Sequence, residues 1–179
     1  LHPLESWPEI FAGQELLVRL DPGQGRGHHD YVKTAGARSK FGVSIGQLGR
    51  LAELAASVGA KIIGLHAHTG SGILSPEEWA DTGLTLARAA ERLPDVRILD
   101  LGGGLGVPNR PSQSALDMVA VDARLAEFKA AHPQFELWME PGRYLVADAG
   151  VLLTTVTQLK DKGDVRYVGV NTGMNSLIR

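Results

Sequence analysis

Apolar residues in the first 140 positions follow two spacings, one typical of strands and one typical of helices. Short apolar runs predict strands at residues 15–23, 61–68, 96–101 and 135–140. Apolar residues at helical spacing predict helices at residues 44–58, about 76–92 and 116–132. Ser75, Pro76 and Glu78 form a capping-box pattern, which predicts the start of the second helix. The alternation of strand and helix predicts parallel strands with helical crossovers.

The pattern changes after residue 140. The segments "GVLLTTVTQL" and "VRYVGVNT" flank the turn "KDKGD" and predict an antiparallel β pair. We place a domain boundary between about Tyr144 and Gly150. The prediction is an α/β domain at residues 1–146, followed at residues 147–179 by the start of a β-rich domain.

Composition narrows the classes of function. The 179 residues carry a net charge of −2 and no basic stripe, which argues against a nucleic-acid partner. No apolar run approaches the length of a membrane span, and the N-terminus lacks the features of a signal peptide. The absence of cysteine excludes a disulfide framework, a thiolate zinc site and a cysteine nucleophile in this sequence. Because the sequence starts with Leu1 instead of methionine and ends within a motif, we expect it to be part of a longer chain.

Chemistry-bearing residues gather where the predicted parallel strands end, which is the edge where ligands bind in barrels and open sheets. They are Asp21, His66 with His68, Gly102 to Gly104, and Glu140 with Arg143. The two histidines are two positions apart on a strand, so they share a side. They could form a metal pair, although no later strand ends in histidine; the motif "HAHTGSG" could also bind phosphate, or the histidines could be structural.

The glycine run has a similar ambiguity. Asp100, Gly102, Gly104 and Gly106 match D-x-G-x-G-x-G, which resembles the first motif of S-adenosylmethionine methyltransferases. Their backbone N–H groups could instead approach a phosphate closely. In "MEPGRY", Glu140 and Arg143 put an acid and a guanidinium close together. The acid could hold a proton on a ring nitrogen and the guanidinium could clamp a phosphate, or the two could form a surface salt bridge.

The ordered set "SKFGVS", "HAHTGSG", "LDLGGGLG" and "MEPGRY" resembles the decarboxylases that share the alanine-racemase-like barrel and use pyridoxal 5'-phosphate. The stretches "DPGQGRGHHDYVKTAGARSKFG" and "GVNTGMNSLIR" favour the members that convert meso-2,6-diaminopimelate to L-lysine. Sister enzymes that act on arginine, ornithine or carboxynorspermidine, and non-catalytic relatives, remain alternatives. The resemblance implies an amino-acid substrate, a cytoplasmic location and a homodimer with shared active sites.

The resemblance also implies roles for individual residues. His68 stacks on the pyridine ring, and Glu140 faces the pyridine nitrogen; these two are the expected catalytic residues. The expected phosphate and ring contacts come from Arg19, Ser71, Gly103, Gly104 and Arg143. Arg143 and Arg179 are expected to bind substrate. No metal is expected.

The implied fold is the back half of a (β/α)8 TIM-type barrel followed by the start of a β-rich domain, because a complete barrel needs about 250 residues. The lysine that carries the cofactor in this family, and the cysteine segment that a partner subunit contributes, correspond to no part of this sequence. Lys40 lies in a different motif, "SKFG". Asn171 and Ser176 stand where the family has aspartate.

Overall fold

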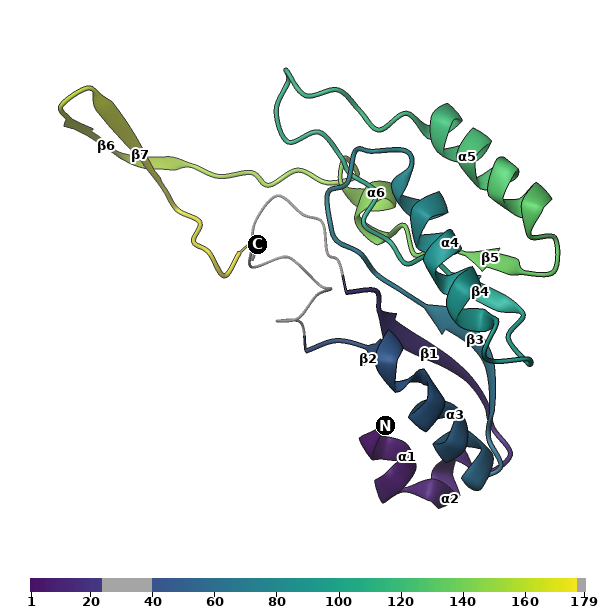
Figure 1. Cartoon of the computed structure of the whole chain (residues 1–179). Coiled ribbons are helices and arrows are strands. Elements are labelled where there is room, and N and C mark those ends of the chain that lie inside the picture. The colour runs from purple at the N-terminus through teal and green to yellow at the C-terminus, as the bar shows by residue number, and fades with distance from the viewer. Residues whose placement is uncertain (24–39, 177–179) are drawn as a thin grey trace. The chain divides into compact units, whose positions relative to one another are not determined.

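The computed structural model describes residues 1–23 and 40–176, and the chain divides into two compact units, Leu1–Leu145 and Val146–Arg179 (Figure 1). The first unit contains a five-stranded sheet in the order β2-β1-β3-β4-β5, and every neighbouring pair is parallel. The strands are β1 (Glu15–Asp21), β2 (Val43–Ser44), β3 (Lys61–His66), β4 (Ile98–Asp100) and β5 (Glu136–Trp138). This sheet confirms the parallel α/β arrangement predicted from the alternation of elements.

Three long helices follow the predicted pattern: α3 (Leu48–Ser57), α4 (Glu78–Ala90) and α5 (Met118–Ala131). The helix predicted at residues 44–58 starts later than expected, because Val43–Ser44 pair with β1 and Ile45–Gln47 form a 3-10 turn, η2. Three short helices were not predicted: α1 (His2–Ser6), α2 (Pro8–Phe11) and α6 (Gly142–Val146). Each has only four or five residues, too few to produce a recognisable helical period.

The predicted capping box before α4 is wrong. The Ser75 hydroxyl donates to the Glu77 carboxylate at 2.7 Å, and Glu77, which is the N-cap, makes no side-chain capping bond. Glu78 is buried in the first turn of α4 instead of reaching back to Ser75. The N-terminus of α5 follows the usual rule, because Asp117 accepts hydrogen bonds from the N–H groups of Val119 and Ala120.

The core of the first unit lies between the sheet and the helices (Figure 1). Leu65 on β3 and Leu99 on β4 are completely buried, and Leu86 on α4 is buried with them. Burial of a leucine side chain contributes about 1.5–3 kcal/mol relative to exposure. Strands β1, β3, β4 and β5 lie side by side in chain order, with helices between β3 and β4 and between β4 and β5, which is the arrangement of a barrel segment.

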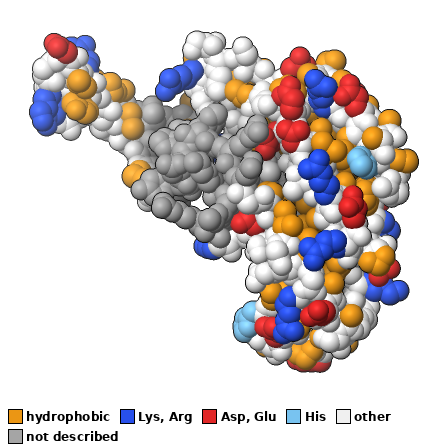
Figure 2. Space-filling model, viewed as in Figure 1, with side chains coloured by type: hydrophobic (Ala, Val, Ile, Leu, Met, Phe, Trp, Pro, Cys, Tyr) orange, Lys and Arg blue, Asp and Glu red, His pale blue; other side chains and the backbone are white. Residues whose placement is uncertain are grey.

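The second unit contains a β-hairpin, formed by β6 (Val156–Lys162) and β7 (Val165–Val170). The strands are antiparallel, as the sequence predicts, and Gly163 in the turn between them has a φ of 59°. The apolar side chains of the hairpin are exposed. Figure 2 shows them among charged residues on the hairpin face in view. Among the described residues, the structure contains no helix long and apolar enough to cross a membrane.

Candidate functional site at the strand ends

The carboxyl ends of the parallel strands bring the predicted polar residues to one edge of the sheet. Arg19 on β1 is in register with His66 on β3, and His66 is in register with Asp100 on β4. Beyond β5, the Glu140 N–H donates to the Gly102 carbonyl at 2.9 Å. The predicted site residues of these four strands therefore share one rim.

His68 is tied directly to the glycine loop, which we define as residues 102–106. The Gly103 N–H donates to His68 Nδ1 at 3.2 Å, so this nitrogen is the acceptor and a neutral ring carries its proton on Nε2. Burial lowers the pKa of His68, and the positive charges of Arg19 and His66 lower it further. Glu140 and Asp100 raise the same pKa, but by less. The site therefore presents a neutral, flat imidazole at neutral pH.

The glycine loop is joined to the segment that contains Ser71. Ile73 donates its N–H to the Gly104 carbonyl at 2.9 Å, and Gly106 donates its N–H to the Ile73 carbonyl at 2.8 Å. A Cβ atom on Gly104 would lie 2.2 Å from the Gly70 carbonyl oxygen, and the φ of Gly104 is 87°. Only glycine fits such a position. The loop therefore lies against the backbone next to Ser71.

The side chains of His66, Asp100 and Glu140 form a cluster at the rim. Each of these residues was named in the sequence analysis, but a cluster of all three was not predicted. His66 Nε2 lies 3.5 Å from Glu140 Oε2, which is an ion pair when His66 is protonated. His66 Nε2 is buried, and no group among the described residues forms a hydrogen bond with it. A carboxylate oxygen of Asp100 lies within 4.8 Å of both groups, a spacing at which the three could surround one cation. The Glu140 side chain is 55% exposed.

The predicted arginines differ in what the structure places around them. The Arg19 guanidinium lies 4.7 Å from the centroid of the Phe41 ring and acts on the pKa of His68, so it is close to the site. Arg143 is exposed on α6, and the described residues give it no ion pair. Arg179 lies outside the described residues. Lys40 lies 5.4 Å from the Phe41 ring centroid.

Asp100 and Trp79 form hydrogen bonds with the glycine loop that the sequence analysis did not predict. Asp100 is buried, and its carboxylate accepts the Gly102 N–H at 2.9 Å. Trp79 on α4 donates its indole N–H to the Gly103 carbonyl at 3.0 Å. The Asp-x-Gly pattern at residues 100–102 contained a signal for the first bond, because aspartate commonly binds the backbone two residues ahead. The spacing of Trp79 predicts only an apolar helix position.

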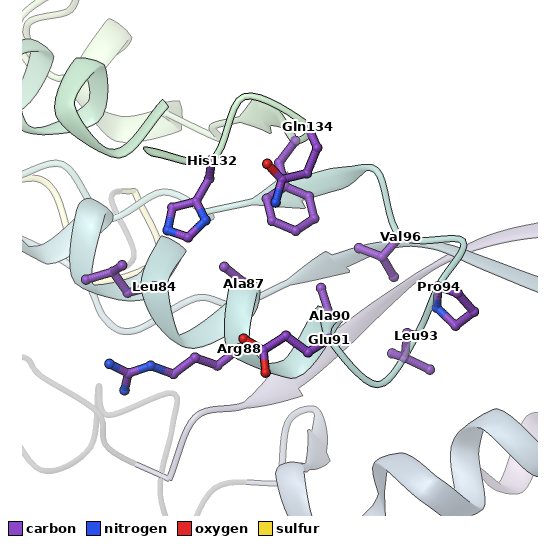
Figure 3. Close-up of a pocket in the computed structure, with 11 residues that line it drawn as sticks. Leu84, Ala87, Arg88, Ala90, Glu91, Leu93, Pro94, Val96, His132 and Gln134 are labelled. Atoms are coloured by element: carbon purple, nitrogen blue, oxygen red, sulfur yellow. The ribbon is translucent and has the colours of Figure 1, made fainter. Parts of the chain in front are cut away.

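A cavity of about 580 Å³ lies away from this rim (Figure 3). Its walls come from the second half of α4, the turn before β4 and the segment before β5. Figure 3 shows Ala87, Val96 and His132 on its different sides. Because Val96 precedes β4, the cavity is at the amino ends of the strands, the face of barrels associated with stability and not with catalysis.

The family comparison matches most of the chain. Residues 3–147 match the family described as "Pyridoxal-dependent decarboxylase, pyridoxal binding domain". This match confirms the family predicted from the motifs and the cofactor that the family uses. Because the match includes the glycine run, it favours the decarboxylase interpretation of that run over the methyltransferase one.

The curated relatives of this chain include diaminopimelate decarboxylases. The chain is 35% identical to the diaminopimelate decarboxylase of Methanothermobacter thermautotrophicus, over 93% of this chain and 41% of the relative. It is 36% identical to that of Deinococcus radiodurans, over 93% of this chain and 42% of the relative. The chain therefore spans about two fifths of the length of these relatives.

Solved structures agree with the fold. A crystal structure of diaminopimelate decarboxylase superposes with a TM-score of 0.82 at 29% identity, covering 98% of this chain and 43% of that one. The Helicobacter pylori diaminopimelate decarboxylase, complexed with L-lysine, superposes with a TM-score of 0.79 at 26% identity, covering 93% and 43%. These superpositions confirm the predicted fold class, a barrel segment followed by β structure. The chain belongs to the pyridoxal-dependent decarboxylases, and its residues 3–147 match their pyridoxal-binding domain.

Proposed function

We propose that the protein containing this chain is a carboxy-lyase that uses pyridoxal 5'-phosphate to convert meso-2,6-diaminopimelate to L-lysine. The observation that carries the proposal is the direct connection between the glycine loop, His68 and Glu140 at one rim. The substrate assignment is supported by the names of the relatives, which are diaminopimelate decarboxylases covering 93–98% of this chain. Arginine and lysine/ornithine decarboxylases superpose at 20% and 24% identity, a level that supports the fold alone.

The residues at the rim fit the three chemical parts of this cofactor. A phosphate requires N–H and O–H donors, and the glycine loop lies beside the hydroxyl-bearing Ser71 segment. A flat ring requires a flat partner, which the imidazole of His68 provides. A protonated ring nitrogen requires an acceptor with negative charge, which the carboxylate of Glu140 provides. Arg143 follows Glu140 by three residues and is exposed, so it can approach a phosphate or a substrate carboxylate.

Each of these residues has a defined task in the proposed reaction. When bound, pyridoxal phosphate supplies an electron sink for the electron pair left when the carboxylate departs as carbon dioxide. Glu140 keeps a proton on the ring nitrogen, which makes that sink stronger. His68 has a lowered pKa, so a neutral imidazole lies against the cationic ring without charge repulsion. The glycine loop and Ser71 hold the phosphate, and Arg19 approaches the ring side.

Further parts of the proposal rest on the resemblance alone. Arg179 binds the substrate carboxylate that is retained, with Arg143 near the phosphate and the substrate. The intact protein is a cytoplasmic homodimer with shared active sites. The cofactor is attached through a lysine that corresponds to no residue of this sequence, so this chain alone should be inactive and should bind the cofactor weakly.

The test uses the intact protein and measures carbon dioxide and L-lysine released from meso-2,6-diaminopimelate. Glu140→Gln should lower kcat by about 100-fold or more, because it removes the negative partner of the ring nitrogen, while cofactor affinity changes much less. Glu136→Gln is the matched control: this exposed carboxylate lies on β5, four residues before Glu140, and accepts the indole N–H of Trp138, so kcat should not change. An unchanged kcat in Glu140→Gln would make Glu140 a structural residue. Preferential turnover of ornithine or arginine would overturn the substrate assignment.

A further inference from the structure

Trp79 links α4 to the glycine loop by a buried hydrogen bond. The residue is in the first turn of α4 and is 1% exposed. Its indole N–H donates to the carbonyl of Gly103, 24 residues away, at 3.0 Å. Buried tryptophans usually find a partner for this donor, and here the partner belongs to the cofactor rim instead of to the helix. The bond therefore connects a residue of the hydrophobic core directly to the backbone of the glycine loop.

Gly103 is fixed from three directions. Its N–H donates to His68 Nδ1 at 3.2 Å, and its carbonyl accepts from Trp79. A Cβ atom on Gly103 would lie 2.2 Å from the Glu140 carbonyl oxygen, so the third side is closed by backbone. The peptide planes on both sides of Gly103 are thus held in one orientation.

The orientation of the Gly103 carbonyl determines the direction of the next N–H group. No described peptide bond is cis, and in a trans peptide the carbonyl and the following N–H point in opposite directions. The Gly103 carbonyl points at Trp79, which belongs to the hydrophobic core. The Gly104 N–H therefore points away from the core. Among the described residues it has no hydrogen-bond partner, and the Ser71 segment is packed against the same glycine.

We propose that Trp79 is a positioning residue for the phosphate of the cofactor. Its indole N–H holds the Gly103–Gly104 peptide so that the Gly104 N–H donates to the phosphate beside Ser71. This inference rests on the proposed function, since it assumes that the rim binds a pyridoxal phosphate. Trp79 itself touches neither ring nor phosphate and acts only through the peptide that it orients.

The test separates the phosphate from the ring. The intact protein is titrated with pyridoxamine 5'-phosphate and with pyridoxamine, which share the ring and need no covalent attachment to a lysine. Trp79→Phe keeps an aromatic side chain and removes the donor. It should weaken binding of pyridoxamine 5'-phosphate by about 3- to 10-fold, the effect of one hydrogen bond, and leave pyridoxamine binding unchanged. The ³¹P NMR shift of the bound phosphate should also change.

Trp138→Phe is the matched control. Trp138 also donates its indole N–H, at 2.7 Å, but its partner is the exposed carboxylate of Glu136 and not the loop. The ratio of the two affinities should stay at the wild-type value. If Trp79→Phe lowers the melting temperature so far that binding cannot be measured, 3-benzothienylalanine at position 79 keeps the fused ring and still lacks the donor.

The outcomes distinguish this inference from the proposed function. If wild-type protein binds neither compound, the proposed function fails. If wild-type protein binds the phosphorylated compound and Trp79→Phe weakens both compounds equally, Trp79 only packs the core and the inference is overturned. An unchanged affinity for both compounds, with an unchanged ³¹P shift, would overturn it as well.

Discussion

The two units of the chain contain similar apolar strands and use them in different ways. In Leu1–Leu145, Leu65 and Leu99 lie on neighbouring parallel strands and are both 0% exposed beneath helices. In Val146–Arg179, Leu159 and Val168 face each other across the hairpin, yet they are 62% and 54% exposed. The side chains are alike, so the difference comes from the layer that covers them.

This contrast separates backbone pairing from core formation. A two-stranded hairpin has its cross-strand hydrogen bonds, but it is marginally stable without a second layer against its apolar face. In the first unit, α3, α4 and α5 supply that layer, and the rim lies at the ends of the strands that they cover. Substitutions in the first unit should therefore have large effects, and equivalent substitutions in the hairpin should have small ones.

The largest effect on stability should come from truncating Leu99 in the first unit. The matching substitution in the hairpin is at Leu159. Leu99→Ala leaves a cavity in a fully buried site and should lower the free energy of unfolding by about 2–5 kcal/mol. Leu159→Ala removes a side chain that is 62% exposed and should change it by less than about 0.5 kcal/mol. Urea denaturation of the intact protein measures both. Equal losses would mean that the hairpin is covered in the intact protein, and the contrast between the units would not hold there.

Two glycines provide a second contrast, at the level of backbone packing. Gly103→Ala places a Cβ atom 2.2 Å from the Glu140 carbonyl oxygen, so the rim must shift, at a cost of about 1–3 kcal/mol. Binding of pyridoxamine 5'-phosphate should be lost with it. Gly150→Ala meets no atom of the described residues within 4 Å and needs no unusual φ, so stability and binding should stay at wild-type values. Denaturation and titration of the two variants check this, and a Gly103→Ala protein with normal binding would refute a tightly packed loop.

The elements of the first unit were predictable where they had a strong period and an apolar face. The strand expected at residues 61–68 is β3 (Lys61–His66), and the helix expected at residues 116–132 is α5 (Met118–Ala131). The start of α3 was not predictable from period alone, because tertiary pairing of Val43–Ser44 with β1 overrides the helical pattern there. At Ser75, a local alternative, the bond to Glu77, replaced the expected cap.

The site was predictable to the extent that it depends on strand ends. Parallel strands bring their carboxyl ends together, so the sequence pattern was enough to place His68, the glycine loop and Glu140 on one rim. The roles of these residues toward ring and phosphate stay predictions. Trp79 could not be assigned to the rim, because its hydrogen bond crosses from a helix to a loop 24 residues away. The periodicity of apolar residues does not predict a hydrogen bond between a helix and a distant loop.

The smallest predicted effect concerns pH and involves the first unit only, since residues 146–179 contain no histidine. Burial, Arg19 and His66 lower the pKa of His68 in the folded protein, against the weaker opposite effects of Glu140 and Asp100. As the pH falls, the unfolded chain therefore takes up a proton near pH 6.5, before the folded state does. This contribution to stability is complete above pH 6.5 and is lost as the pH falls from 6.5 to the lowered pKa.

NMR titration measures this directly in the intact protein. The ring signals of His68 should titrate with a midpoint below 6.5, and the amide signal of Gly103 should move with the same midpoint, because protonated Nδ1 can no longer accept its N–H. The amides of β6 and β7 should stay constant over that range. His68→Gln should make the fall in unfolding free energy between pH 7 and 5.5 less steep. A His68 midpoint at or above 6.5, or a Gly103 signal that does not follow it, would separate the imidazole from the loop and remove the electrostatic reason for a neutral ring at this rim.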